Sequence, residues 1–219
     1  MNLCPKRWSR RKEARPREIL EAALELFAEK GYAATRIDEI AKLAGVTRGT
    51  PYLYFAGKED IFKALINELL LPALDEAEAM LDGFAGSASE RLRRVVHVWW
   101  QGMGETRLSA LPKLMIAEAG NFPEVVQLYN DQFIVRGQVI FRREIEAGIA
   151  SGEFTPIDVD YALHVLVAPV IMAMLWRYMP QGCGFDKLDP IRYLDTLLDL
   201  MLRGLLQRPE SLSEASDHA

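Results

Sequence analysis

Residues 35–55 read TRIDEIAKLAGVTRGTPYLYF, and this stretch indicates two short helices joined by a glycine turn. Thr35 and Asp38 have the spacing of a capping box at the start of the first helix. Gly45 can adopt the left-handed conformation that ends a helix, and Thr47 can cap a second helix running to about Phe55. The stretch therefore predicts a helix-turn-helix, small enough to lay its second helix in the major groove of DNA.

The side chains of that second helix suit a DNA contact. Its first turn carries polar groups that can reach base edges and phosphates, its glycine permits close backbone approach, and its two phenol hydroxyls can reach phosphate oxygens. These residues are Thr47, Arg48, Gly49, Thr50, Tyr52 and Tyr54. An ordinary helical hairpin with a solvated polar face has the same spacing, so spacing alone leaves both interpretations open.

Charge distribution favours the DNA interpretation. The whole chain has a net charge of −5, but residues 1–58 hold 12 Lys and Arg against 7 Asp and Glu, a net of +5. The remaining residues hold 14 against 24, a net of −10. A basic head on an acidic body is what a phosphate-binding domain requires. The basic segment before residue 17 predicts an arm along the DNA backbone or in a minor groove, with a solubilising N-terminus as the alternative.

Residues 17–66 resemble the DNA-binding head of the tetracycline-repressor (TetR) family. The resemblance rests on LFAEKGY at the end of the first helix, on the hairpin of residues 35–47, on GTPYLYF, and on KED opening the next helix. Pro51 and Gly57 depart from the usual pattern without threatening it. The resemblance implies a transcriptional regulator, most simply a repressor, and DNA contacts from Arg15, Arg17, Thr35, Arg36 and Lys58 in addition to the second-helix residues.

The rest of the chain predicts an all-α fold of about nine helices. Half of the residues are apolar, and sustained strand-type alternation is scarce. Pro16 fits the first position of the first helix. Beyond the hairpin we expect helices at about 58–81, 90–103, 111–119, 124–150, 159–178 and 191–206. We expect a DNA-binding domain over residues 1–57, an effector-binding and dimerisation domain over 58–207, and a disordered tail over 208–219.

Composition also indicates a cytoplasmic protein without a membrane span. The basic N-terminus lacks a following apolar run, so no secretory signal is expected. Cys4 and Cys183 lie far apart without metal-type spacing, and no cofactor or metal is expected. The longest apolar run, 161–176, contains His164 and Pro169 and is shorter than the roughly 18 residues that suggest a span.

The last two predicted helices form the candidate dimer surface. The helix at 159–178 is apolar on all sides, so that one face can fill its own domain while another meets a second copy. Two such helix pairs would make a four-helix interface, and a homodimer would present two recognition helices to a palindromic operator. The stripe expected on the last helix comprises Tyr193, Leu197, Leu200, Met201 and Gly204. A monomeric core needing no partner is the alternative.

The middle helices carry aromatic, methionine and scattered polar residues that suit a ligand cavity. We expect a small apolar or aromatic effector to contact His97, Trp100, Met103, Glu118, Tyr129, Phe133, His164 and Met172. Plain core packing is the alternative for each residue, and the family resemblance favours the cavity for the set.

Catalysis finds little support, so we expect no enzyme. The histidines belong to no metal-binding or catalytic motif, and no nucleophile elbow or phosphate loop is present. The competing hypothesis is an all-α enzyme or metal-binding protein that uses His97, Glu118 and His164, with an incidental helix-turn-helix. A helical adaptor that binds protein is a third hypothesis, and the charge split opposes it.

Overall fold

The computed structural model describes residues 6–179 and 188–207, with side chains from Arg15 onward. Cys4, Cys183, His218 and the tail predicted from residue 208 lie outside the described residues. Within those ranges the regular elements are all helices, and the only pairing of extended backbone is an isolated bridge between Phe154 and Leu206. The predicted all-α fold is confirmed.

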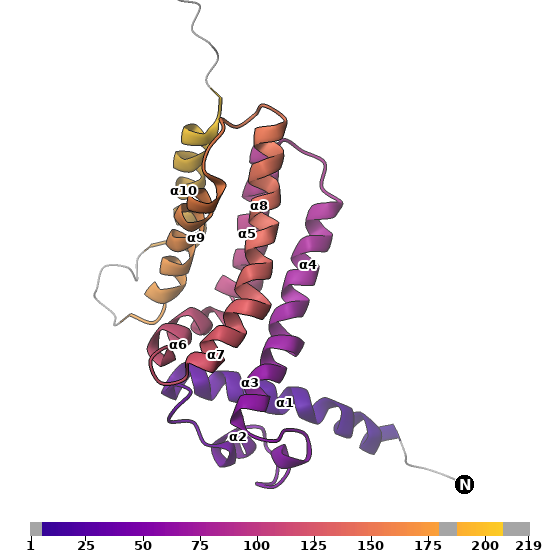
Figure 1. Ribbon diagram of the computed structural model, residues 1–219. Helices are drawn as coiled ribbons and strands as arrows, with labels where there is room; N and C mark the ends of the chain where they lie inside the picture. The colour runs from indigo at the N-terminus through magenta and orange to yellow at the C-terminus, as the bar shows by residue number, and fades with distance from the viewer. Residues whose placement is uncertain (1–5, 180–187, 208–219) are drawn as a thin grey trace, which may run out of the picture.

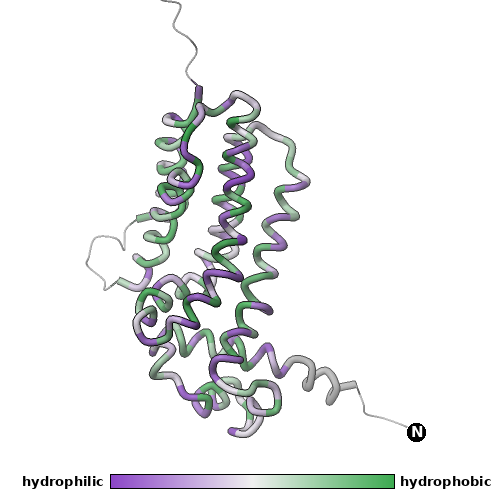
Figure 2. Tube along the Cα trace, viewed as in Figure 1, coloured by the Kyte–Doolittle hydropathy of each residue, from purple (hydrophilic) through white to green (hydrophobic). Residues whose placement is uncertain are grey.

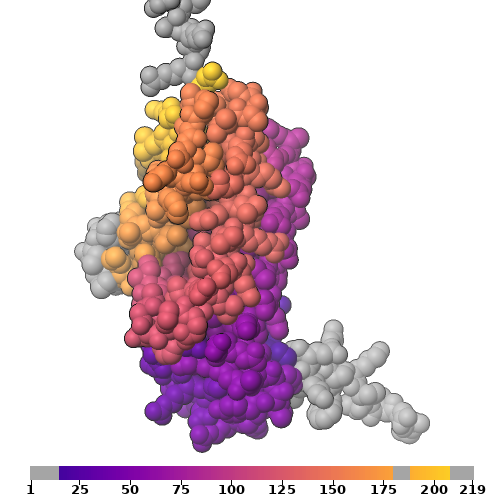
Figure 3. All heavy atoms as spheres, in the orientation of Figure 1, coloured from indigo at the N-terminus to yellow at the C-terminus, as the bar shows by residue number. Residues whose placement is uncertain are grey.

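The head consists of α1 (Lys6–Lys30), α2 (Ile37–Leu43), the short 3-10 helix η1 (Pro51–Leu53) and α3 (Lys58–Leu65). It forms the base of the molecule, with α1 running across it (Figure 1), and the space-filling view shows the same lower end covered by N-terminal residues (Figure 3). An aromatic cluster fastens α1 to α3, because the Phe27 ring lies 5.2 Å from the Tyr32 ring and 6.3 Å from the Phe62 ring. These buried rings make the head a packed unit.

The first helix begins ten residues earlier than predicted. Pro16 lies inside α1, which starts at Lys6. A proline inside a helix removes one backbone hydrogen bond, but it does not oblige the chain to start the helix there. The backbone of the basic segment from Lys6 is therefore helical and continuous with α1, while its predicted contact with the DNA backbone or a minor groove stays a prediction.

The body stands on the head as a set of long, roughly upright helices (Figure 1). These are α4 (Leu71–Asp82), α5 (Ala88–Trp99), α8 (Val135–Ala150), α9 (Val159–Trp176) and α10 (Pro190–Leu205). The 3-10 helix η4 (Arg107–Ala110), α6 (Leu111–Glu118) and α7 (Pro123–Tyr129) are short and lie where body meets head.

Three π-helical turns interrupt otherwise regular helices. They are η2 (Ile66–Leu70) between α3 and α4, η3 (Trp100–Gly104) after α5, and η5 (Asn130–Ile134) between α7 and α8. Counted with these turns, the described residues contain the nine predicted helical segments, although the third is not a regular α-helix. Each π-turn inserts extra backbone into a turn, so side chains beyond it point in directions that a regular helical period does not predict.

A buried ion pair joins the two central helices of the body. Glu144 on α8 is fully buried, and its carboxylate accepts hydrogen bonds from the Arg91 guanidinium of α5 at 2.6 and 2.9 Å. Arg91 also donates to the carbonyls of Leu81 and Phe84 at the end of α4. Three helices thus meet at one charged group. Hydrophilic and hydrophobic residues alternate along the helices of the body (Figure 2), as is typical of amphipathic helices around a shared core.

Candidate functional site

The turn of the helix-turn-helix has the geometry that the sequence predicts. Gly45 has φ +66°, its N–H donates to Lys42 O at 3.2 Å, and the Val46 N–H donates to Ala41 O at 3.0 Å. This pair of hydrogen bonds closes the end of α2 and requires a residue that tolerates positive φ. Gly45 therefore fixes the direction in which the chain leaves α2.

The start of α2 differs from the predicted capping box. The N-cap is Arg36, whose backbone N–H donates to the Glu39 carboxylate at 3.2 Å. Thr35 is instead buried, and its hydroxyl donates to Gly31 O at 2.7 Å and to Leu26 O at 3.2 Å. Thr35 thus fastens the end of α1 to the start of α2, and its buried side chain does not support the predicted contact with DNA.

The predicted recognition helix is a turn followed by η1, not a regular α-helix. The N–H groups of Thr50, Leu53 and Tyr54 donate to the carbonyls of Thr47, Thr50 and Pro51, each three residues back, at 2.9–3.1 Å. Pro51 has no N–H to continue an α-helical ladder from Thr47, so the tighter pattern takes its place. The sequence interpretation underestimated this effect of Pro51.

The segment nevertheless presents a surface to solvent. Tyr52 is 56% exposed and Leu53 is 80% exposed, although both are large apolar or aromatic residues. Thr47 and Thr50 share a hydrogen bond of 2.7 Å between their hydroxyls. Arg48 is exposed and forms a bidentate pair with Asp38 of α2, at 2.7 and 2.6 Å. Gly49 is exposed and Tyr54 is half-buried. Arg48 must exchange Asp38 for any DNA group that it contacts.

The other predicted DNA-contact cations lie in different settings. Arg17 is exposed and pairs with Glu21 of the same helix at 3.1 Å. Arg15 is half-buried and lies 3.4 Å from Glu18, while Arg36 is exposed. Pairs within one exposed helix face contribute little and exchange readily with solvent or phosphate. These three arginines remain available to a ligand outside the protein.

Lys58 is engaged inside the protein. Its ammonium group donates to the carbonyls of Tyr32, Ala33 and Thr35 at 2.6, 3.1 and 3.2 Å. The same group lies 4.5 Å from the centre of the Tyr32 ring. Burial lowers the pKa of Lys58 below its ordinary value, and the negative charge of Glu118 opposes this shift only in part. All three ammonium hydrogens have acceptors, so this geometry does not support the predicted phosphate contact.

Glu118 belongs to this same head–body junction. It is buried at the end of α6, and its Oε1 accepts a hydrogen bond of 3.0 Å from the Ala33 N–H of the head. Its Oε2 has no hydrogen-bond partner among the described residues. Phe122 completes the contact, with its ring 4.9 Å from that of Tyr32. Burial raises the pKa of Tyr32 to about 12. The junction therefore couples the loop after α1 to both α3 and α6.

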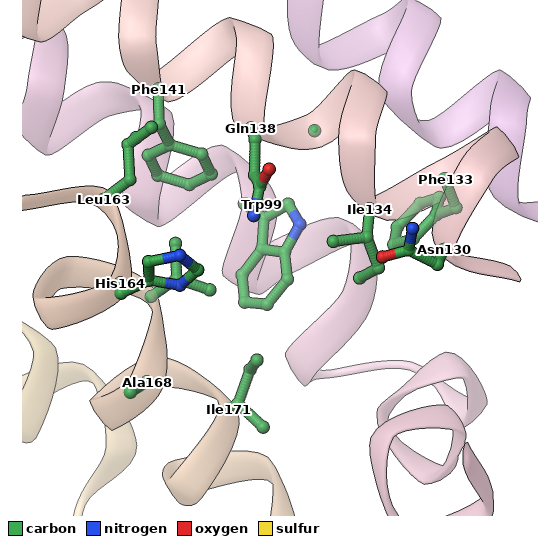
Figure 4. A pocket seen from close by; sticks show the side chains of 12 residues that line it. Trp99, Asn130, Phe133, Ile134, Gln138, Phe141, Leu163, His164, Ala168 and Ile171 are labelled. Carbon is green, nitrogen blue, oxygen red and sulfur yellow. The ribbon is translucent and has the colours of Figure 1, made fainter. Parts of the chain in front are cut away.

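The body contains a cavity of about 350 Å³ between α8 and α9, floored by α5 (Figure 4). That volume lies at the small end of the usual range for small-molecule sites, about 300–1,000 Å³. Apolar and aromatic side chains dominate its walls. The residues that line it are Trp99, Asn130, Phe133, Ile134, Gly137, Gln138, Phe141, Leu163, His164, Val167, Ala168 and Ile171.

Two of the eight predicted ligand residues, Phe133 and His164, line this cavity. The others do not. Trp100, Met103 and Tyr129 are core residues, with Tyr129 stacked on Phe133 at 5.3 Å and its pKa raised by burial. Met172 is 42% exposed on the outer face of α9. Glu118 accepts a hydrogen bond at the head–body junction, and His97 lies beside Asp195 of α10.

Trp99 lines the cavity in place of its neighbour Trp100. Trp100 is 1% exposed and is the first residue of the π-turn η3, whereas Trp99 ends α5. The sequence pattern could not choose between adjacent tryptophans, because both follow the buried residues Leu92, Val95 and Val96 of α5 at helical spacing and η3 changes the helical period there. Asn130 and Gln138 are among the polar residues of the middle helices that suit a cavity in the sequence but are absent from the eight predicted contacts, and Ile134 lies in the π-turn η5, where the regular helical period does not apply.

The predicted alternative site of His97, Glu118 and His164 is not assembled. The His97 Nε2 lies 2.9 Å from Asp195 of α10, Glu118 lies at the head–body junction, and His164 lines the cavity. Among the residues that the structure describes, no group of three or more His, Cys, Asp or Glu side chains is placed to hold a metal ion. The three residues lie in different parts of the molecule, so they do not form the catalytic or metal-binding site that the hypothesis requires.

The residues predicted to form the dimer stripe are partly or fully exposed on α10. The residues that face the core of the protomer are Leu194, Leu198, Leu202 and Leu205. Beside them, Leu200 is 66% exposed, Gly204 is exposed, and Tyr193, Leu197 and Met201 are half-buried. On α9, Tyr161 is 74% and Val165 is 61% exposed. Together α9 and α10 present an apolar face outside the protomer core.

The α9 helix is longer than the apolar run in the sequence suggested. It has 18 residues and only 28% of that window is buried, so by length and composition alone it could cross a membrane. It is the one helix of this kind within the described ranges. The length argument against a span is therefore wrong. An exposed apolar helix in a helical bundle is equally explained by contact with a second protein surface.

Two family profiles match the chain over successive regions. The profile described as bacterial regulatory proteins, tetR family, matches residues 19–65, and the profile described as tetracyclin repressor-like, C-terminal domain, matches residues 85–182. The first covers the helix-turn-helix and α3, and the second covers most of the body, including the cavity. Both parts of the molecule thus resemble the corresponding parts of one family.

Relatives extend that similarity over nearly the whole chain. The fatty acid metabolism regulator protein of Bacillus subtilis is 29% identical over 199 residues, covering 89% of this chain and 98% of its own. The crystal structure of transcriptional regulator FadR from Bacillus subtilis with stearoyl-CoA superposes with a TM-score of 0.71 at 29% identity, covering 85% and 97%. That of a putative transcriptional regulator from Saccharomonospora viridis with choline gives 0.73 at 28%, covering 90% and 100%.

Proposed function

The chain belongs to the tetR family of bacterial transcriptional regulators, and from this premise we propose that it is a cytoplasmic, homodimeric repressor released from a palindromic operator by a small molecule. Residues 1–57 form the DNA-binding head in this proposal, and residues 58–207 form the effector-binding and dimerisation body. α3 belongs physically to both, because it packs in the head and continues through η2 into α4. The enzyme hypothesis is not supported, since members of this family are DNA-binding regulators.

The exposed segment of residues 47–54 is the observation that carries the DNA proposal. An exposed leucine and an exposed tyrosine lie at the end of the molecule, beside a guanidinium and two hydroxyls. Exposed apolar groups that gather in one place, next to polar groups, are typical of a surface that binds a partner. Arg48 and Thr50 are the candidate base contacts, while Arg17 and Tyr52 are candidate phosphate contacts. Arg15, Arg36, Thr47, Gly49 and Tyr54 complete the proposed interface.

The cavity of the body is the proposed effector site. Two structural relatives are complexes with small molecules, stearoyl-CoA and choline, and we propose a small-molecule effector for this chain as well. Its apolar walls would hold the ligand by burial, at roughly 25 cal/mol per Å² of apolar area. Phe133 and His164 remain in the proposed set, and Trp99 replaces Trp100.

A second copy of the chain is the proposed partner of the α9 and α10 face. The exposed apolar residues of α9 have a spacing of one and two helical turns, so Tyr161, Val165 and Met172 form one stripe along that helix, and Leu200 of α10 is exposed as well. Two such faces would make a four-helix interface. Two heads are needed because a single half-site offers few base contacts, and the symmetry of the dimer would match that of the operator.

A route for the coupling lies between cavity and head. The π-turn η5 carries the cavity residues Asn130, Phe133 and Ile134, and it packs against η2 in the segment that joins α3 to α4. A ligand that displaces η5 would therefore move α3, whose first residue is Lys58 of the head–body junction. Coupling of about 1–3 kcal/mol would change operator affinity roughly five- to 150-fold.

Selection from a random duplex library, followed by fluorescence anisotropy, tests the proposal. The selected sites should be palindromic, and binding should weaken steeply as salt rises because phosphate contacts release counterions. Light scattering of the complex should give two chains for each selected site. Failure to select any duplex, or salt-independent binding, would remove the DNA-binding function. Asymmetric sites bound by one chain would remove the dimer.

A further inference from the structure

The cavity between α8 and α9 contains polar groups that have no hydrogen-bond partner among the described residues. The side chains are Trp99 of α5, Gln138 of α8 and His164 of α9, and none makes a side-chain hydrogen bond with another described residue. Asn130, the fourth polar residue of the lining, differs because its amide donates to Asp131 at 3.1 Å. Three helices thus each contribute one unused polar group to one cavity.

These groups are not spread evenly over the walls. Figure 4 shows Gln138 above the Trp99 ring and His164 to its left, with Ala168 and Ile171 below. His164 is exposed, while Gln138 and Trp99 are half-buried, so the polar groups lie toward the solvent side. Phe133 and Leu163 are buried and form part of the apolar wall. The cavity is therefore amphipathic: Gln138, His164 and Trp99 lie around one part of a mostly apolar lining, while Asn130 lies apart from them (Figure 4).

The described residues that line this cavity include no Asp, Glu, Lys or Arg. The arginines that flank its α8 wall already have carboxylate partners: Arg136 pairs with Asp75 and Glu78, and Arg142 pairs with Asp160 and Glu146. An anionic ligand would find no unpaired cation, and a cationic ligand would find aromatic rings but no carboxylate. Burial of a charge without a partner is far costlier than burial of a hydroxyl or carbonyl that gains a hydrogen bond.

We infer that the effector is an uncharged amphiphile, with an apolar or aromatic body and one hydroxyl or carbonyl head held by Gln138, His164 and the Trp99 N–H. This inference rests on the proposed effector function of the cavity. Gln138 can donate and accept, the Trp99 indole can only donate, and His164 can do either according to its tautomer. The lack of an unpaired arginine or lysine thus distinguishes this cavity from one built for a phosphate or a carboxylate.

Calorimetric titration with ligands that share one apolar body tests the inference. The probes are butylbenzene, para-butylphenol, para-butylbenzoate and para-butylphenyl-trimethylammonium. The phenol should bind wild-type protein about three- to tenfold more tightly than butylbenzene, as one net hydrogen bond implies. It should bind at least about tenfold more tightly than either ion, because neither ion finds a partner of opposite charge.

Variants separate recognition from packing. Gln138→Leu and His164→Leu should each reduce the advantage of the phenol over butylbenzene while leaving the affinity for butylbenzene within about twofold. Gln127→Leu is the matched control, since Gln127 is exposed on α7 and does not line the cavity. Equal weakening of both probes in the Gln138 and His164 variants would assign these residues to packing and overturn their role.

Two further outcomes would overturn the inference. One is an ion that binds as tightly as the phenol, and the other is a wild-type protein that binds none of the probes. Operator binding, measured on the same samples by the library selection described above, keeps the two proposals distinct. Intact operator binding with no uncharged ligand leaves the regulator in place and removes this ligand class, whereas loss of operator binding removes the regulator itself.

Discussion

Head and body carry their function in opposite ways. The candidate DNA contacts of the head lie mainly on one exposed stretch of eight residues, 47–54, whose members are close in space because they are close in sequence. The cavity of the body takes residues from α5, η5, α8 and α9, between Trp99 and Ile171. A local surface tolerates substitution of its side chains, whereas an assembled cavity depends on the packing of every helix around it. Each experiment below tests one side of that comparison.

The largest effect is expected at the dimer face. Leu200→Arg should leave the protomer folded, because Leu200 is 66% exposed, but it should place a charge in the proposed interface. Loss of the second head removes an effectively intramolecular contact and should lower operator affinity by about 10²–10⁴-fold. Analytical ultracentrifugation and anisotropy measure both quantities. Ile116→Arg is the control, since Ile116 is 67% exposed on α6. A dimer with normal affinity in Leu200→Arg would place the interface elsewhere.

Adjacent tryptophans give the next test. Trp100→Ala should lower the free energy of unfolding by about 3–5 kcal/mol, because Trp100 is 1% exposed and its loss leaves a cavity in the core. Trp99→Ala should cost clearly less stability, since Trp99 is half-buried, and should weaken binding of para-butylphenol. Urea unfolding followed by circular dichroism compares the two. Equal destabilisation, with unchanged ligand binding in Trp99→Ala, would show that Trp99 is core as well.

Substitution of Lys58 tests whether the DNA-binding surface of the head includes the start of α3. Lys58→Met should lower the free energy of unfolding by roughly 1.5–3 kcal/mol, because three carbonyls lose a charged donor. The slope of operator affinity against salt should stay unchanged, since the ammonium is not expected to contact phosphate. Arg17→Ala should behave oppositely, with normal stability and a slope smaller by about one unit. A reduced slope in Lys58→Met would restore Lys58 as a phosphate contact.

Base readout should depend on the exposed segment without affecting the fold. Arg48→Ala and Thr50→Ala should each weaken operator binding by about 1–3 kcal/mol if they contact base edges. Their melting temperatures should remain close to wild type, because Arg48 is exposed and Thr50 is only half-buried. Lys42→Ala, an exposed change on α2, is the matched control. Unchanged affinity in both variants would exclude this segment from recognition.

The smallest effect concerns a cap within the body. Glu153 accepts hydrogen bonds from the Ala88 and Ser89 N–H groups at 2.6 and 2.9 Å, at the start of α5. Burial acts to raise the pKa of Glu153, but hydrogen bonds from Ser89 and Ala88 outweigh it and hold this pKa below its ordinary value. The resulting stability is present above the unfolded pKa of about 4.3 and is lost as pH falls through the lower folded pKa.

Glu153→Ala should therefore lower the free energy of unfolding by about 1 kcal/mol at neutral pH, and the difference from wild type should shrink below about pH 4. Urea titrations at several pH values measure it. Glu105→Ala serves as the control, since Glu105 is an exposed residue after η3. A pH-independent difference would mean that the charge of Glu153 contributes nothing.

The sequence predicted the head best where its signals are local. The turn at Gly45 could be predicted because the end of a helix often needs a residue that tolerates positive φ, and glycine meets that need within a few residues of chain. The sequence did not reveal the internal partners of Thr35 and Lys58, whose polar side chains suggest a surface but donate to carbonyls at the end of α1 and in the loop that follows it. Residue type alone does not reveal whether a donor faces water or a backbone acceptor.

By itself the sequence determined the all-α class, the nine helical segments, the charge division and the position of the helix-turn-helix. Each follows from local periodicity, composition or turn chemistry. Only the tertiary structure decided that Trp99 and not Trp100 lines the cavity, that Gln138 joins His164 there, and that Glu118 lies at the head–body junction. These outcomes depend on how helices pack across long sequence separations and on π-turns that shift the helical period, and no local pattern encodes either.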